Sequence, residues 1–183
     1  MPALASAECG TSVPFVSAAD HPRDAGATAT VILGVGNLLQ GDDGVGVHAV
    51  QALLDRDPPE GVVVLDGGVA PLDALAGVGP VDRLIIIDAA DLGEPPGTIR
   101  VLAPDDLIPA AGESVSLHDL NLLWALGVLR ATGEAPPEIV IVGVQPESME
   151  WSTELSPAVA ARLGEVVEAV LARAGQPSAV DAL

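Results

Sequence analysis

The sequence predicts a single three-layer α/β/α domain built on a mixed sheet of five strands. Short β-rich apolar runs alternate with segments of helical period, which is the pattern of helices packed on both faces of a sheet. The 183 residues suffice for one buried core and are too few for two ordinary domains. One connection between strands is also too short for a parallel crossover.

Composition restricts the classes of function that the chain can have. Its 26 acidic and seven basic residues give a formal charge of −19, which repels nucleic-acid phosphates. No apolar run approaches the roughly 20 residues of a membrane-spanning helix, so we expect no membrane insertion. The lone Cys9 provides neither an internal disulfide nor a thiolate metal site. These features favour a cytoplasmic protein that binds no nucleic acid.

The two ends of the chain look like tails. Residues 1–29 show neither helical nor strand period and lack the pattern of a secretory signal, and residues 176–183 look frayed. We therefore expect Cys9 and His21 to be solvated bystanders. The ordered domain is predicted to span residues 30–175.

Four apolar runs predict strands that are buried on both faces. TVILGV begins at Thr30, GVVVL at Gly61, LIIID at Leu84 and EIVIVGV at Glu138. The second and third runs are each followed or ended by an aspartate.

The remaining strand, TIRVL at residues 98–102, is expected to run against the others. Only residues 89–97 connect it to the third strand, and they contain two prolines and two glycines. A parallel crossover usually needs about a dozen residues or more, commonly a helix. We therefore predict that the fourth strand is antiparallel to the third.

Helical spacing predicts the helices between the strands. In the first, Val47, Val50 and Leu54 form the buried side and His48 lies on the wet side as a solvated residue. A weaker apolar helix is expected at residues 71–78.

Two longer helices follow in the second half. A capping pair, Ser116 and Asp119, opens a helix over residues 117–131 that Gly133 ends. A last helix is expected after Pro157. The predicted apolar stripes are Leu120, Leu123, Trp124 and Val128 in the first, and Val159, Leu163, Val166, Val167 and Val170 in the second.

Acidic residues gather where the predicted strands end. The turn GVGNLLQGDDGVG (34–46) follows the first strand, Asp66 follows the second, and Asp88 ends the third. His118 lies in the first turn of a helix. In α/β sheets, ligands bind beyond the carboxyl ends of the parallel strands, so we expect the site at this rim.

A dinucleotide loop is one reading of the turn, because Gly34 and Gly36 match the first two glycines of G-x-G-x-x-G. Leu39 stands at the third position, and Asp42 and Asp43 would repel a pyrophosphate. The hypothesis of a nucleotide-dependent oxidoreductase therefore depends on these two glycines alone.

A metal site explains the crowded carboxylates better, since carboxylates with imidazole suit divalent transition metals. A helix N-terminus also favours the neutral imidazole that binds metal. Structural roles remain open for each residue: Asp43 as a cap, Asp88 as a hydrogen-bond acceptor from its loop, and His118 as a surface residue. Asp42 suits a capping or turn role, and Asp66 suits the Gly67-Gly68 turn.

The segments together resemble the hydrogenase maturation proteases, which process the large subunits of nickel-iron hydrogenases. The resemblance spans about residues 31–164. It rests on LGVGNLLQGDDGVG (33–46), LDGG (65–68), LIIIDA (84–89), SLHDL (116–120) and VGVQPES (142–148). It implies a phosphorylase/hydrolase-like fold and a five-stranded mixed sheet with one antiparallel strand. The family's metal contacts, carried over, are Asp43, Asp88 and His118, with Asp43 at a position that is often Glu.

The resemblance implies a nickel-dependent endopeptidase that removes the C-terminal extension of a large-subunit precursor after nickel insertion. The nickel would belong to the substrate, and the enzyme is expected to be a monomer. Two mechanisms stay open: nickel as a Lewis acid, or a carboxylate as general base. The sequence offers no plausible Ser/His/Asp or Cys/His set, since Cys9 lies in the expected tail, and it contains no G-x-S-x-G turn. The alternative is a non-catalytic nickel-sensing chaperone of the precursor.

Overall fold

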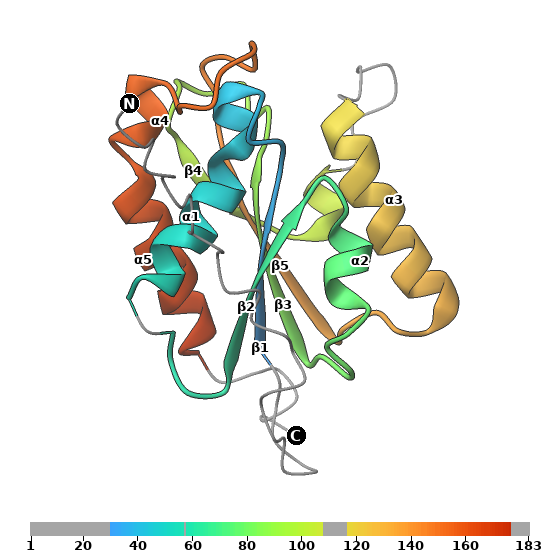
Figure 1. Ribbon diagram of the computed structural model, residues 1–183. Coiled ribbons are helices and arrows are strands. Elements are labelled where there is room, and N and C mark those ends of the chain that lie inside the picture. Colours follow the sequence, from blue (N-terminus) through green and yellow to red (C-terminus); the bar gives the residue numbers. More distant parts are fainter. Residues whose placement is uncertain (1–29, 57, 108–116, 177–183) are drawn as a thin grey trace, which may run out of the picture.

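One sheet of five strands, in the order β2-β1-β3-β5-β4, forms the centre of the molecule. The computed structural model describes residues 30–56, 58–107 and 117–176 (Figure 1). The strands are β1 (Thr30–Val35), β2 (Val62–Gly68), β3 (Arg83–Ala89), β4 (Ile99–Leu102) and β5 (Glu138–Val144). The expected tails fall outside these ranges, apart from Gln176, so the predicted domain limits stay predictions.

The mixed sheet with one antiparallel strand is confirmed. β1 pairs in parallel with β2 and β3, β3 pairs in parallel with β5, and β4 pairs antiparallel with β5. The direction of β4 relative to β3 agrees with the short connection between them. β4 lies beyond β5 at the edge of the sheet rather than next to β3.

Helices cover both faces of the sheet. α1 and α5 lie on one face and α2 and α3 on the other, as Figure 1 shows. In the described part of the chain, every helix is too short or too polar to cross a bilayer. The helical elements are η2 (Gly41–Gly44), α1 (Val45–Leu54), α2 (Pro71–Leu75), η3 (Pro104–Leu107), α3 (Leu117–Thr132), α4 (Pro157–Ala160) and α5 (Leu163–Ala174).

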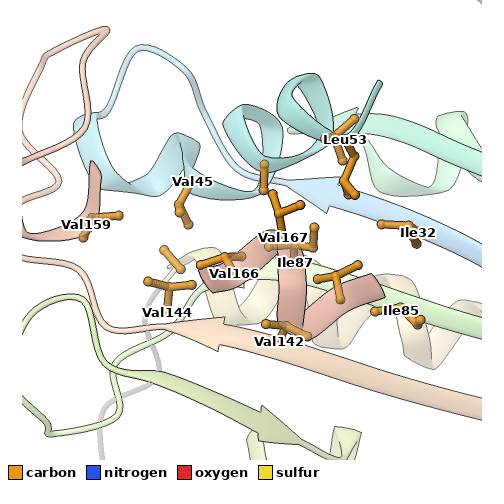
Figure 2. Packing of buried hydrophobic residues seen from close by; sticks show 14 residues of the cluster. Ile32, Val45, Leu53, Ile85, Ile87, Val142, Val144, Val159, Val166 and Val167 are labelled. Carbon is orange, nitrogen blue, oxygen red and sulfur yellow. The ribbon is translucent and has the colours of Figure 1, made fainter. Parts of the chain in front are cut away.

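The alternation of side chains along the strands divides the core in two. Ile85, Ile87 and Ala89 of β3 face the cluster formed with α1 and α5, part of which is shown in Figure 2. Leu84 and Ile86 face the second cluster, which includes Leu122 and Leu126 of α3. Successive residues of a strand point to opposite faces, so a buried parallel strand needs apolar residues throughout.

Glycine on the inner face of α1 lets this helix pack directly against strand backbone. A Cβ at Gly46 would lie 2.2 Å from the carbonyl oxygen of Ile87 and 2.3 Å from that of Val35. A Cβ at Gly34 would lie 2.2 Å from the carbonyl oxygen of Gly46. The glycines of the turn motif therefore serve helix–strand packing here.

The predicted faces of two helices were wrong in detail. In α1, Leu53 is buried and Leu54 is 42% exposed, and His48 is half-buried rather than solvated. In α3, Trp124 is 65% exposed while Leu122 and Leu126 are buried. Each helix has two neighbouring apolar stripes, and the way the helix packs on its face of the sheet determines which stripe is buried.

Three further elements differ from expectation. β2 is half-buried because it is an edge strand, and α2 ends at Leu75 rather than near Val78. The helix expected after Pro157 is two helices, because the Arg162 amide donates to Val159 O three residues back and α5 then begins at Leu163. Ala161 and Arg162 both favour helix, so neither residue accounts for the break.

The expected end of α3 is confirmed at Gly133, whose φ of 76° lies in the left-handed region. The Glu134 amide donates to Leu129 O at 2.9 Å, which closes the helix as glycine caps commonly do. Ser116, the expected first cap of this helix, lies outside the described residues.

Candidate functional site

The carboxyl ends of β1 and β3 bring two predicted site residues to one rim of the sheet. Asp43 lies in η2, after the glycine-rich turn that follows β1, and Asp88 lies near the end of β3. η2 packs against β3. The two carboxylates therefore sit on adjacent elements, as the rule for parallel strands led us to expect.

Asp43 is fully buried and holds the turn that precedes it. Its Oδ2 accepts a hydrogen bond from the Asn37 amide at 2.6 Å, and Asn37 Oδ1 in turn accepts from the Leu39 amide at 3.0 Å. Asp43 is not the cap of α1, because Gly44 occupies that position and Gly has no side chain to cap with. Sequence reasoning did not single out Asn37, although GVGN marks a turn.

Asp88 is 4% exposed, and its Oδ1 accepts from the Ala89 amide at 2.9 Å. Leu84 and Ile86 of the same strand face α3. Because side chains alternate along a strand, Asp88 points to that same face. The third predicted residue, His118, is the second residue of α3.

Figure 1 shows α3 starting at the end of the sheet where β1 leads into η2. The backbone therefore brings the start of α3 to the rim of Asp43 and Asp88. The side chain of His118 is not among those described, and within the described residues no group of three His, Cys, Asp or Glu is placed to hold a metal ion. The convergence of Asp43, Asp88 and His118 stays a prediction.

Asp42, the neighbour of Asp43, has a structural role. It is 1% exposed; its Oδ2 accepts from the amides of Glu147 at 2.8 Å and Ser148 at 3.1 Å, and its Oδ1 accepts from the Ser156 amide at 2.7 Å. The expected turn or capping role is therefore correct in kind. Its partners, however, lie in the distant loop between β5 and α4.

Replacing Asp42 by asparagine should lower the free energy of unfolding by about 3 kcal/mol, because the amide NH2 would face backbone donors that a carboxylate oxygen now satisfies. Urea unfolding followed by circular dichroism measures this. Asp73→Asn is the control, since Asp73 is exposed on α2 and such a change is usually within about 0.5 kcal/mol. Equal stability of the two variants would contradict the role of Asp42.

Two more rim residues have clear roles. Asp66 Oδ1 accepts from the Gly68 amide at 2.9 Å, which confirms its expected role in the Gly67-Gly68 turn. Gln145, from the motif VGVQPES, is 8% exposed, and its Oε1 accepts from the amides of Leu92 at 2.7 Å and Glu94 at 3.3 Å. The sequence analysis did not single out Gln145. Its position as a polar residue directly after a buried strand was the signal that could have identified it.

A groove of about 690 Å³ lies between α2 and α3, at the other end of the sheet. It is lined by Leu72, Leu75, Pro80, Val128, Leu129 and Pro136, among others. Its walls include the segments that lead into β3 and β5, so it is remote from Asp43 and Asp88. The groove and the candidate site are therefore separate features.

The fold and these residues define a three-layer α/β protein whose buried carboxylates, Asp42, Asp43 and Asp88, lie at the carboxyl rim of its sheet. Residues 47–173 match the family model described as hydrogenase maturation protease. The chain belongs to the hydrogenase maturation protease family and is an endopeptidase of that family.

Two relatives illustrate the match. The chain is 39% identical over 155 residues to the hydrogenase 2 maturation protease of Escherichia coli (strain K12), covering 84% of this chain and 94% of that protein. It is 38% identical over 122 residues to the hydrogenase expression/formation protein HoxM of Azotobacter vinelandii. That alignment covers 66% of this chain and 59% of HoxM.

Solved structures agree with the fold. The hydrogenase maturating endopeptidase HybD from E. coli superposes with a TM-score of 0.69 at 37% identity, covering 81% of this chain and 94% of that one. The [NiFe] hydrogenase maturation protease HycI from Thermococcus kodakarensis KOD1 has a TM-score of 0.64 at 27% identity, covering 81% and 93%.

Proposed function

We propose that the protein removes the C-terminal extension of a nickel-iron hydrogenase large-subunit precursor once nickel has been inserted. The observation that carries this proposal is the position of Asp43 and Asp88, two buried carboxylates on adjacent elements of the rim, in a chain of this family. The start of α3 at the same rim supports His118 as the third member.

In this proposal Asp43, Asp88 and His118 contact the nickel that the precursor carries. Oxygen and imidazole donors form a suitable set for a divalent transition metal. Buried carboxylates are poorly screened by water, so they attract a cation more strongly than exposed ones. The three residues would thus distinguish a loaded precursor from an empty one, and the loaded precursor would be held with its extension at the rim.

The test is cleavage of purified precursor with and without nickel, followed by mass spectrometry of the precursor. We expect cleavage at least about 100-fold faster for the loaded precursor, because even changes to the outer-shell partners of metal ligands cost up to about 100-fold. Equal cleavage of both forms, or none with nickel, would contradict the proposal. A complex with unchanged precursor mass would instead favour the nickel-sensing chaperone.

Serine- and cysteine-protease inhibitors should leave this cleavage unchanged. The chain has one cysteine, Cys9, and no G-x-S-x-G turn. Treatment with a thiol-alkylating reagent is the direct measurement, and loss of processing would show that a nucleophilic thiol takes part.

A further inference from the structure

Two exposed apolar residues lie beside the candidate site on segments that are far apart in sequence. Leu39, in the turn after β1, is 50% exposed, and Trp151, in the loop between β5 and α4, is 80% exposed. A short parallel bridge joins the two segments at Gln40 and Ser152. Leu39 and Trp151 each directly precede a bridged residue, so they lie on neighbouring stretches of backbone.

The backbone that presents Trp151 is held firmly. The Ser152 amide donates to Leu39 O at 3.1 Å, and the Gly41 amide donates to Ser152 O at 2.8 Å. Ser152 Oγ also accepts from the Glu154 amide at 3.0 Å. Together with the bonds to Asp42, these contacts tie the loop to the turn that carries Asp43. A partner seated on Trp151 would therefore be positioned relative to Asp43.

The same loop is strongly acidic. Glu147, Glu150 and Glu154 are exposed, and residues 146–156 contain no arginine, lysine or histidine. The ion pairs of the described residues do not include these three glutamates. We call Leu39, Trp151 and the three glutamates the rim surface. Its charge favours a basic partner, and an arginine can also stack on the exposed indole.

We propose that the rim surface docks a segment of the large-subunit precursor that carries basic and apolar side chains. This inference rests on the proposed function. A second copy of the chain suits the surface poorly, because it would bring the same glutamates together. Tryptophan is common among the residues that contribute most to interfaces, and the hydrogen-bonded backbone beside Trp151 means that little backbone freedom is lost when a partner covers it.

Trp151→Ala should raise the KM for precursor cleavage. The matched control is Trp124→Ala, which removes the other tryptophan, 65% exposed on α3. The control should leave the KM at the wild-type value. A KM that stays at the wild-type value in Trp151→Ala would overturn the proposal.

The charges are tested with Glu147→Gln, Glu150→Gln and Glu154→Gln combined. This variant should raise KM and flatten its dependence on salt concentration, because fewer exposed charges remain to be screened. An unchanged salt dependence would count against a basic partner. Circular dichroism of each variant is the control for folding.

Calorimetric titration of the precursor separates this proposal from the proposed function. If the wild type binds but does not cleave, the function fails, and a Kd raised in Trp151→Ala but not in Trp124→Ala still supports docking. If both variants bind the precursor like the wild type, the docking proposal is contradicted and the proposed function is unaffected. Absence of wild-type binding overturns both, and a dimer that disappears in Trp151→Ala would assign the surface to a second copy.

Discussion

Asp88→Asn should lower cleavage of the nickel-loaded precursor at least about 100-fold, because changes to outer-shell partners of metal ligands already cost up to about 100-fold and Asp88 is proposed to contact the nickel directly. The substitution keeps the shape of the side chain, and an amide oxygen can still accept from the Ala89 amide as Oδ1 does now at 2.9 Å. What it removes is the charge that would face nickel. Single-turnover cleavage measured by mass spectrometry tests this, and full activity would exclude Asp88 from the site.

The same loss is expected for Asp43→Asn and His118→Ala, because the three residues are proposed to act as one set. Asp66→Asn is the matched control. Asp66 lies on the same rim, is exposed, and needs only an oxygen that accepts from the Gly68 amide, which asparagine supplies. His48→Ala should likewise keep cleavage within about twofold, since a residue outside the site does not contribute to the chemical step.

Gly46→Ala should lower the free energy of unfolding by about 3 kcal/mol or more, the upper range for overpacking in a core. The added methyl would lie 2.2 Å from Ile87 O and 2.3 Å from Val35 O, and both atoms belong to strand backbone that cannot rotate away. α1 would have to move off the sheet. Because η2 directly precedes α1, the shift should also displace Asp43 and reduce cleavage.

Gly127→Ala provides the comparison within α3, where an added Cβ meets no atom within 4 Å. At such a position alanine should be equal or up to about 1 kcal/mol more stable, because it favours helix over glycine. Urea unfolding of both variants gives the result. Similar midpoints for the two would show that α1 can move away from the strands at little cost.

Much of the fold could be read from local pattern. Runs such as LIIID predict a buried strand because a central parallel strand must be apolar on both faces. The short connection before β4 predicted its direction because a parallel return requires more chain. The stripes of α1 and α3 were predicted less well. By spacing alone, Trp124 and Leu122 could each belong to the buried stripe of α3. The position of α3 on the sheet buries Leu122 and exposes Trp124.

The candidate site was predictable to the extent that it depends on topology. Asp43 and Asp88 follow or end parallel strands, and the carboxyl ends of such strands meet at one edge. The role of Asp42 was not predictable in the same way. Its three amide partners come from residues 147–156, more than a hundred positions along the chain. No local pattern identifies such partners.

Periodicity, strand ends and ordered motifs are local properties of a chain, and they were enough to predict the class of fold, the family and the rim on which Asp43 and Asp88 lie. Three features emerged only in the folded chain: Asp42 holds the loop of Trp151, Leu39 and Trp151 lie on adjacent segments, and Gly46 lets α1 approach two strands. These features depend on distances between segments that are remote in sequence, and such distances are set when the sheet and its helices pack.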